Sequence, residues 1–300
     1  MARRYLLVML VAFAATPLFL ASTEAAPRNP PKVARHLAPK PRWQTLPLPP
    51  PMPAATTSGT VEVGDVRIYF ATYGTGAPVI LLHGGLGNAD HFAFQVPALA
   101  AKYQVIAIDS RGQGRSTLSK QPLSYHVMAG DVLAVMDHLK VTRAALFGWS
   151  DGGVIALDLA IEHPERVSRL FVLGTNYHSS GSKPRKGASP PTFTAYAAKC
   201  KTDYHRLSKT PKAYGAMVSS LLPIWRRAGG FTKDQMRSIK APTVVADGDH
   251  DEIVVLDHLE EMALLIPDAR LVVFKDTSHF ALWQDPEAVT AAVLEFLAAP

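Results

Sequence analysis

The sequence of 300 residues has a single cysteine, Cys200, and few charged residues. One cysteine excludes a disulfide within the chain, so the fold must be stable through its hydrophobic core alone. No nucleophile motif surrounds Cys200, which argues against a catalytic thiol. Charged residues make up 19% of the chain and hydrophobic residues 48%. This composition excludes a chain that is disordered overall and is sufficient for one large domain.

The sequence also lacks motifs for nucleic acids or nucleotides. The formal net charge is +6, but no aromatic-basic or groove-reading motif accompanies it. The glycines of "DSRGQGRS" (109–116) are not followed directly by a helix, and no G-K-[ST] is present. We therefore interpret this segment as a structural turn and expect no nucleic-acid partner.

Residues 1–26 are typical of a secretory signal peptide. Two early arginines precede an apolar stretch at 5–20, and small residues follow near Ala25. The stretch is slightly short for a membrane span of about 20 residues, so we expect cleavage near Ala25 rather than an uncleaved membrane anchor. The Arg3-Arg4 pair is a weaker indication of twin-arginine export. The sequence thus predicts a periplasmic or secreted protein.

Residues 27–59 contain ten of the chain's 24 prolines and no acidic residue. Such a segment cannot bury a core, and it predicts an extended, disordered, basic linker. A second basic segment, 176–240, holds thirteen lysines and arginines and two aspartates. Both segments permit binding to an anionic surface or polymer. A plain spacer and a solvated face are the simpler interpretations.

From residue 60 to residue 300 the pattern alternates between strand and helix. A hairpin turning at Gly64-Asp65 is predicted first. Continuous apolar runs, typical of strands buried on both faces, follow at 78–84, 104–109, 143–149, 169–175, 242–249 and 269–277. Helical patterns separate them, including 88–103, 124–140 with Ser124 as its N-cap, and 151–164. We predict an α/β fold with a mostly parallel sheet and helices on both faces, with 176–240 inserted as a small helical cap.

"GWSDG" (148–152) matches the G-x-S-x-G pattern of a nucleophile elbow. A bare match is weak, and a glycine-flanked turn with an incidental serine is the alternative. Here the motif follows a predicted strand and opens a predicted helix, which is the context that it requires. Gly148 and Gly152 prevent clashes at such a tight turn. The Ser150 hydroxyl would then lie beside a helix N-terminus, where backbone N–H groups favour a developing oxyanion.

A serine nucleophile needs a base, and the base needs an acid that orients it. Each should lie in a loop just past a later strand. "VVADGDHDEI" places Asp247, Asp249 and Asp251 past one strand, and "VVFKDTSHF" places His279 past the next. Both loops are expected at the same edge of the sheet as Ser150. The spacing of the aspartates and the nearby histidine is unconvincing for a metal site, and no metal or cofactor is expected.

Residues 60–300 resemble the α/β-hydrolase superfamily. The segments "LLHGGLGN", "DSRGQGRS", "GWSDGG", "GDHD" and "TSHF" match its successive signatures in order. The resemblance implies that Asp251, at the last position of a G-x-x-D loop, is the acid of a catalytic triad. Asp249 is the reserve, and Asp247 is expected to be too close to the strand. His279 would deprotonate the serine, and Asp251 would hold the tautomer of the histidine.

The oxyanion hole should use the backbone N–H of Asp151, the residue after the nucleophile. By resemblance, the second donor is the backbone N–H of Gly85, in the loop after a strand. Leu86, Trp149 and Asp151 are the residues expected to contact substrate. His83 is expected to order the loop by hydrogen bonding, as in the family, rather than to act as a base.

The side chain of Asp151 suggests a finer hypothesis about substrate charge. "GWSDGG" is similar to the elbow of hydrolases related to valacyclovir hydrolase, which act on amino-acid esters, so this carboxylate would pair with an ammonium. The preferred alternative is that Asp151 stabilises the helix N-terminus, by about 0.3–1 kcal/mol. The basic cap also argues against a cationic substrate.

The sequence thus predicts an exported serine hydrolase that cleaves a small carboxylic ester, thioester, lactone or amide through an acyl-enzyme. A serine at the elbow argues against haloalkane dehalogenase and epoxide hydrolase chemistry, which need a carboxylate nucleophile. C–C bond hydrolysis, perhydrolysis and a non-catalytic ligand-binding role are the alternatives. The pattern alone predicts neither the substrate nor the oligomeric state.

Overall fold

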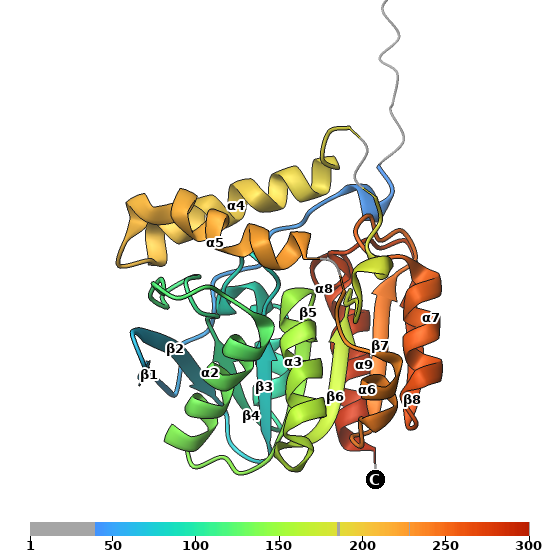
Figure 1. Ribbon diagram of the computed structural model, residues 1–300, viewed down its shortest axis with the longest axis horizontal. Coiled ribbons are helices and arrows are strands. Elements are labelled where there is room, and N and C mark those ends of the chain that lie inside the picture. Colours follow the sequence, from blue (N-terminus) through green and yellow to red (C-terminus); the bar gives the residue numbers. More distant parts are fainter. Residues whose placement is uncertain (1–39, 185–186, 228, 300) are drawn as a thin grey trace, which may run out of the picture. The chain divides into compact units, whose positions relative to one another are not determined.

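The computed structural model describes residues 40–184, 187–227 and 229–299 (Figure 1). The predicted signal peptide and the first part of the predicted linker lie outside these residues. Within the described part of the chain, no helix combines the length and the hydropathy of a transmembrane span.

The described residues form an eight-stranded sheet in the order β1-β2-β4-β3-β5-β6-β7-β8. The strands are β1 (Thr57–Val63), β2 (Val66–Tyr73), β3 (Pro78–Leu82), β4 (Gln104–Ile108), β5 (Ala144–Trp149), β6 (Val167–Leu173), β7 (Thr243–Gly248) and β8 (Ala269–Phe274). β2 pairs antiparallel with β1 and β4, and the other pairs are parallel. The predicted mostly parallel α/β sheet is therefore confirmed. The predicted hairpin is present too, with Val63 opposite Val66.

Helices cover both faces of the sheet. They are α1 (Val96–Ala100), α2 (Tyr125–His138), α3 (Asp151–Glu162), α4 (Pro191–Leu207), α5 (Tyr214–Arg226), α6 (Lys233–Ser238), α7 (Leu256–Leu265), α8 (Ala281–Gln284) and α9 (Pro286–Ala298). Figure 1 shows α2 and α3 in front of the sheet and α9 behind it. Ser124 is the N-cap of α2, since its hydroxyl accepts the Val127 N–H at 3.1 Å. The central strands β3 to β7 are buried almost completely, which explains their continuous apolar runs. The run at 269–277 is an exception, because β8 lies at the edge of the sheet and is only partly buried.

The segment 88–103 differs from the single helix that its pattern predicts. It forms a 3-10 helix (Ala89–Phe92) and then the short α1. Pro97 has no N–H to donate to the preceding turn, so it is accommodated in the first turn of a new helix. The interruption follows from this proline, which the apolar periodicity conceals.

The predicted disordered linker is corrected for its described part, residues 40–59. The Trp43 ring stacks on His250, with ring centroids 4.7 Å apart, and the Arg42 guanidinium pairs with Asp285 at 2.7 Å. β1 already begins at Thr57. Leu46 and Met52 pack against the core, and the aromatic and basic side chains of the segment contact partners on the domain surface.

The predicted cap is formed by α4 and α5, which lie across the carboxyl edge of the parallel strands (Figure 1). The predicted end of the insert at residue 240 is too late. α6 begins at a capping box between Thr232 and Gln235 and packs beside α7, on the flank of the sheet. The cap therefore ends before α6, and the chain then returns to the sheet at β7.

Gly152→Ala tests how tightly the turn between β5 and α3 is packed. An added Cβ would overlap the carbonyl group of Leu82 in the neighbouring β3. We expect the free energy of unfolding, measured by urea denaturation, to fall by about 1–3 kcal/mol or more. Gly130→Ala in α2 is the control, because its Cβ would meet no atom within 4 Å. That variant should be neutral or stabilised by about 0.4–1 kcal/mol. Equal stability of the two variants would contradict this packing.

Candidate active site

Ser150 lies on a strained turn between β5 and α3. Its backbone has φ 54° and ψ −121°, a region that non-glycine residues rarely adopt. A Cβ on Gly148 would clash with the backbone of Gly152, and a Cβ on Gly152 would clash with the backbone of Leu82. The turn is held from below, because the Ser150 N–H donates to the carbonyl of Leu173 in β6 at 2.8 Å. The sequence context of the elbow is therefore present in the fold.

His279 joins Ser150 to Asp251 by hydrogen bonds. Its Nε2 lies 2.9 Å from the Ser150 Oγ, and its Nδ1 lies 2.6 Å from the Asp251 Oδ2. The other Asp251 oxygen accepts the backbone N–H groups of Ile253 and Val254, the latter at 2.7 Å. His279 and Asp251 are buried. The structure thus brings together the three side chains that the sequence analysis selected as nucleophile, base and acid.

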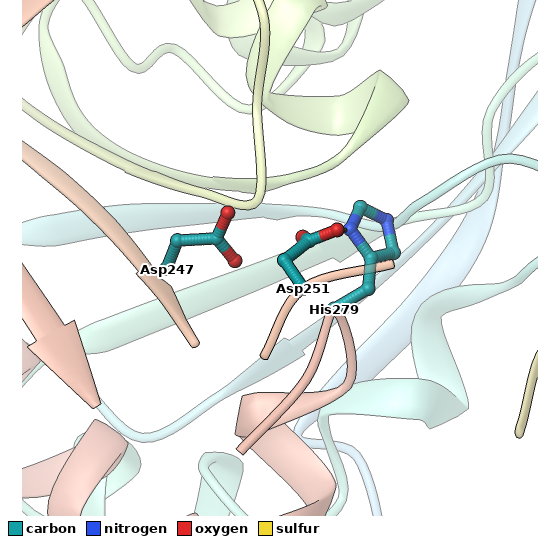
Figure 2. A group of neighbouring side chains, drawn as sticks. All are labelled: Asp247, Asp251 and His279. Atoms are coloured by element: carbon teal, nitrogen blue, oxygen red, sulfur yellow. Dashed lines mark hydrogen bonds and ion pairs between the residues drawn. The ribbon is translucent and has the colours of Figure 1, made fainter. Parts of the chain in front are cut away.

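The two other candidate aspartates occupy different places. Asp249, the reserve acid, pairs instead with His250, at 2.7 Å, and Lys275. Asp247 lies within β7 itself and is only 1% exposed. Figure 2 shows its carboxyl group directed toward Asp251. The expectation that Asp247 lies too close to the strand to be the acid agrees with this position.

The pair of His279 and Asp251 has shifted pKa values. Burial alone would lower the pKa of His279, but the charge of Asp251 and its hydrogen bond outweigh burial and raise it. Burial alone would raise the pKa of Asp251, but the charge and hydrogen bond of His279 outweigh it and lower this pKa. A neutral His279 with its proton on Nδ1 would direct the Nε2 lone pair at Ser150.

The loop after β3 packs against the elbow. A Cβ on Gly85 would lie 2.5 Å from the Asp151 Oδ2, so glycine permits this approach. The Tyr196 hydroxyl of α4 donates to the carbonyl of Gly85 at 2.8 Å. Asp151 is the first residue of α3, where a backbone N–H has no acceptor within the helix. Gly85 and Asp151, the predicted oxyanion-hole residues, are therefore adjacent to each other and to Ser150.

His83 links this loop to the loop after β4. Its Nε2 accepts the Ser110 N–H at 2.9 Å, and its Nδ1 lies 2.8 Å from the Gly84 carbonyl. Burial lowers the pKa of His83 to about 3, so the ring is neutral. This arrangement suits the predicted role of His83 in ordering the loop.

A cavity of about 860 Å³ opens above Ser150 and beneath the cap. Ser150, His279, Gly85, Asp151 and Trp149 line its floor, and aromatic and aliphatic side chains of the cap line its wall: Phe193, Tyr196, Leu222, Ile224 and Trp225. Leu86, which was expected to contact substrate, does not line the cavity. It is 7% exposed and packs in the core, with its backbone in the left-handed region at a φ of 67°.

The Asp151 side chain faces the cavity and already has two donors. It accepts the Tyr125 hydroxyl at 2.9 Å and the Trp225 Nε1–H at 2.8 Å. Burial raises the pKa of Asp151. Trp225 belongs to α5, so this cluster connects the cap to the elbow. Tyr125 and Trp225 were not predicted from the sequence, since an aromatic residue in a helix carries no signal of such a contact.

Charged groups of both signs reach the cavity. Lys183, Arg226 and Arg227 line it together with Glu252 and Asp158. Glu252, which was not predicted from the sequence either, accepts the backbone N–H of His279 at 3.1 Å and the Thr192 hydroxyl at 2.5 Å. Through Thr192, the cap helix α4 therefore contacts the loop that carries the acid, and Glu252 joins that loop to the backbone of the base.

One group of described residues places its ligand atoms close enough together to hold a metal ion. These are Asp247, Asp251 and His279, whose atoms lie within 4.8 Å of one another (Figure 2). A cation at that place would compete with the His279 proton that faces Asp251.

Comparisons with known proteins identify the family of the fold. A family model described as "alpha/beta hydrolase fold" matches residues 77–203 and 193–286. The chain is 29% identical over 281 residues to 2-hydroxy-6-oxononadienedioate/2-hydroxy-6-oxononatrienedioate hydrolase of Comamonas testosteroni, which covers 81% of this chain and 97% of that protein.

Solved structures show the same fold. Est816, described as an N-acyl homoserine lactone degrading enzyme, is 29% identical with a TM-score of 0.62, covering 79% of this chain and 100% of its own. The meta-cleavage product hydrolase CumD from Pseudomonas fluorescens IP01 has a TM-score of 0.69 at 21% identity, covering 80% and 97%. The second likeness shows the fold alone.

Asp251→Asn tests the electrostatic origin of the shifted pKa of His279. In the unaltered protein an NMR titration should give a His279 pKa above the ordinary value of about 6.5. In the variant the pKa should fall below that value, because burial remains while the carboxylate charge is lost. Asp249→Asn is the control and should leave the pKa unchanged, since Asp249 pairs elsewhere. The same His279 pKa in all three proteins would contradict the assignment.

Proposed function

Because this chain belongs to the alpha/beta hydrolase fold family, we propose that it is a serine hydrolase whose nucleophile, base and acid are Ser150, His279 and Asp251. One observation carries the proposal. A serine on a strained elbow is hydrogen-bonded to a histidine at 2.9 Å, and that histidine is hydrogen-bonded to a buried aspartate at 2.6 Å. This is the geometry that activates a weak hydroxyl nucleophile.

The proposed reaction has two halves. The Ser150 Oγ attacks a carbonyl carbon while His279 Nε2 takes the hydroxyl proton, and Asp251 stabilises the imidazolium that forms. The backbone N–H groups of Gly85 and Asp151 stabilise the tetrahedral oxyanion, each contributing about 3 kcal/mol. The carbonyl reforms, the bond to the leaving group breaks, and His279 protonates that group. Water then attacks the acyl-enzyme by the same steps and releases the acid and Ser150.

We propose a small carboxylic ester or lactone as the substrate, with a thioester or amide as chemically related alternatives. The apolar wall formed by Phe193, Tyr196 and Trp225 suits an apolar acyl group. The similarity to a protein described as degrading N-acyl homoserine lactones supports the lactone within this class. No resident cofactor takes part in the proposed steps.

A second candidate function is the hydrolysis of a C–C bond next to a ketone. It is favoured by the 29% identity to the hydrolase of 2-hydroxy-6-oxononadienedioate, which spans nearly the whole of that relative. In this case Ser150 attacks the ketone carbon, and the departing carbon is protonated. Lys183, Arg226 and Arg227 at the cavity suit the carboxylates of such a substrate.

The amino-acid ester hypothesis gains less support. Both donors that face the Asp151 carboxylate are neutral groups of the protein itself, Tyr125 and Trp225. A substrate ammonium would have to displace one of them or share an oxygen. The interpretation of Asp151 as a structural residue at the start of α3 is therefore preferred.

We also propose that the protein is exported to the periplasm or beyond the cell, with anchoring by the N-terminus as the alternative. The proposal depends on the composition of residues 1–26. Binding of the basic segments to an anionic surface or polymer stays a prediction.

A chain-length series of p-nitrophenyl esters tests the proposed function. Ser150→Ala should lower turnover by roughly a million-fold, as loss of a nucleophile does. Ser180→Ala is the control, because Ser180 lies outside the cavity lining and is hydrogen-bonded to His178. It should retain the activity within a few-fold.

The same assay distinguishes the candidate substrates when lactones, an amino-acid ester and 2-hydroxy-6-oxononadienedioate are included. Preference for the dienedioate would support the C–C bond hydrolase. Equal rates for the unaltered protein and Ser150→Ala on every substrate would contradict serine catalysis.

A further inference from the structure

Asp247 is a buried carboxyl group that the proposed mechanism does not use. It lies in β7 and is 1% exposed. Its Oδ1 accepts the Gly248 N–H at 2.8 Å, while its Oδ2 meets no N–H or O–H donor among the described residues. Figure 2 shows the carboxyl group directed at Asp251, on the side opposite His279. Side-chain oxygens of the two aspartates lie within 4.8 Å of each other.

The two aspartates differ sharply in the donors that surround them. Asp251 accepts two backbone N–H groups on one oxygen and the His279 ring on the other. Asp247 accepts one N–H only. Two neighbouring carboxyl groups in a buried site cannot both be ionised, and the group with fewer donors keeps its proton. The negative charge is therefore expected on Asp251, and the proton is expected on the Oδ2 of Asp247, which accepts no hydrogen bond from the described residues.

We propose that Asp247 is a neutral carboxylic acid that donates its proton toward Asp251 and thereby positions, and tunes, the acid of the triad. This inference rests on the proposed function, since Asp247 acts through Asp251 and His279. The direction of the pKa shift agrees with the geometry. Burial, the charge of Asp251 and a hydrogen bond with it raise the pKa of Asp247 well above its ordinary value.

The donated hydrogen bond has a defined effect on the base. It draws negative charge away from the Asp251 oxygens and so weakens their attraction for the His279 imidazolium. Asp247 would thus keep the pKa of His279 lower than Asp251 alone would set it. The neutral form of the base, which the reaction needs, would then persist to lower pH.

Other charged groups face this cluster from the surrounding elements. They are Glu252 beside Asp251, Asp151 at the start of α3, and Lys183, which donates to the backbone carbonyl of Asp251. Each is present in all variants described below, so the comparison isolates Asp247.

Two substitutions that keep a side chain branched at Cγ separate the proton donor from the space that it fills. Asp247→Asn keeps an acceptor for Gly248 and a donor for Asp251, and it is neutral at every pH. Asp247→Leu removes the donor. The pH profile of kcat/KM should keep its acidic limb within a few tenths of a pH unit in Asp247→Asn. In Asp247→Leu the limb should move to higher pH by about one unit, because the imidazolium is held more strongly.

An opposite result would overturn the inference. If Asp247 were ionised, Asp247→Asn would remove a negative charge and move the acidic limb to lower pH. An unmoved limb in Asp247→Leu would also overturn it.

An infrared measurement makes the test independent of catalysis and of the folding of Asp247→Leu. The unaltered protein at pH 7 should show a carboxylic-acid C=O band that is lost in Asp247→Asn. Absence of such a band would overturn the inference whatever the activity. The two proposals can fail separately. If the band is lost in Asp247→Asn but Ser150→Ala retains full activity, Asp247 is neutral as inferred and the proposed function is refuted.

Discussion

The buried hydrogen bond between His279 and Asp251 is the interaction on which the rest of the site depends. An imidazole and a carboxylate, both buried, are unfavourable apart and stable only together with further hydrogen bonds. The backbone N–H groups of Ile253 and Val254 supply those bonds on the far side of Asp251. The loop after β7 must therefore keep one conformation, and that conformation fixes the ring of His279 against Ser150.

The topology of the sheet explains why these residues meet. Ser150, Asp251 and His279 follow β5, β7 and β8, which run parallel, so the loops after them lie at one edge. The cap closes that edge with α4 and α5, and it is tied to the site by specific contacts. Tyr196 holds the loop of Gly85, and Trp225 holds Asp151. Movement of the cap would therefore shift Gly85 and Asp151, the residues directly beside the nucleophile.

Much of this arrangement is predictable from the sequence because its signals are local. A G-x-S-x-G pattern between an apolar run and a helical pattern determines the elbow, and the last two strands are followed at once by the acidic loop and the histidine loop. The resemblance to a known family then selected Asp251 over Asp249. The contacts that the sequence analysis missed are made across long distances in the chain. Tyr125, Trp225 and Glu252 gain their roles only when helices and loops far apart in sequence pack around the same cavity. The stacking of Trp43 was not predicted for the same reason, because its partner His250 lies far away along the chain.

The central claim is that Ser150 is a nucleophile activated by His279. It is tested most directly by mass spectrometry after reaction with a fluorophosphonate, which bonds covalently to activated serines. We predict that one adduct forms, on the peptide that contains Ser150, and that it is lost in both Ser150→Ala and His279→Ala. An unlabelled protein, or an adduct that forms on another residue or survives the His279 substitution, would contradict the account.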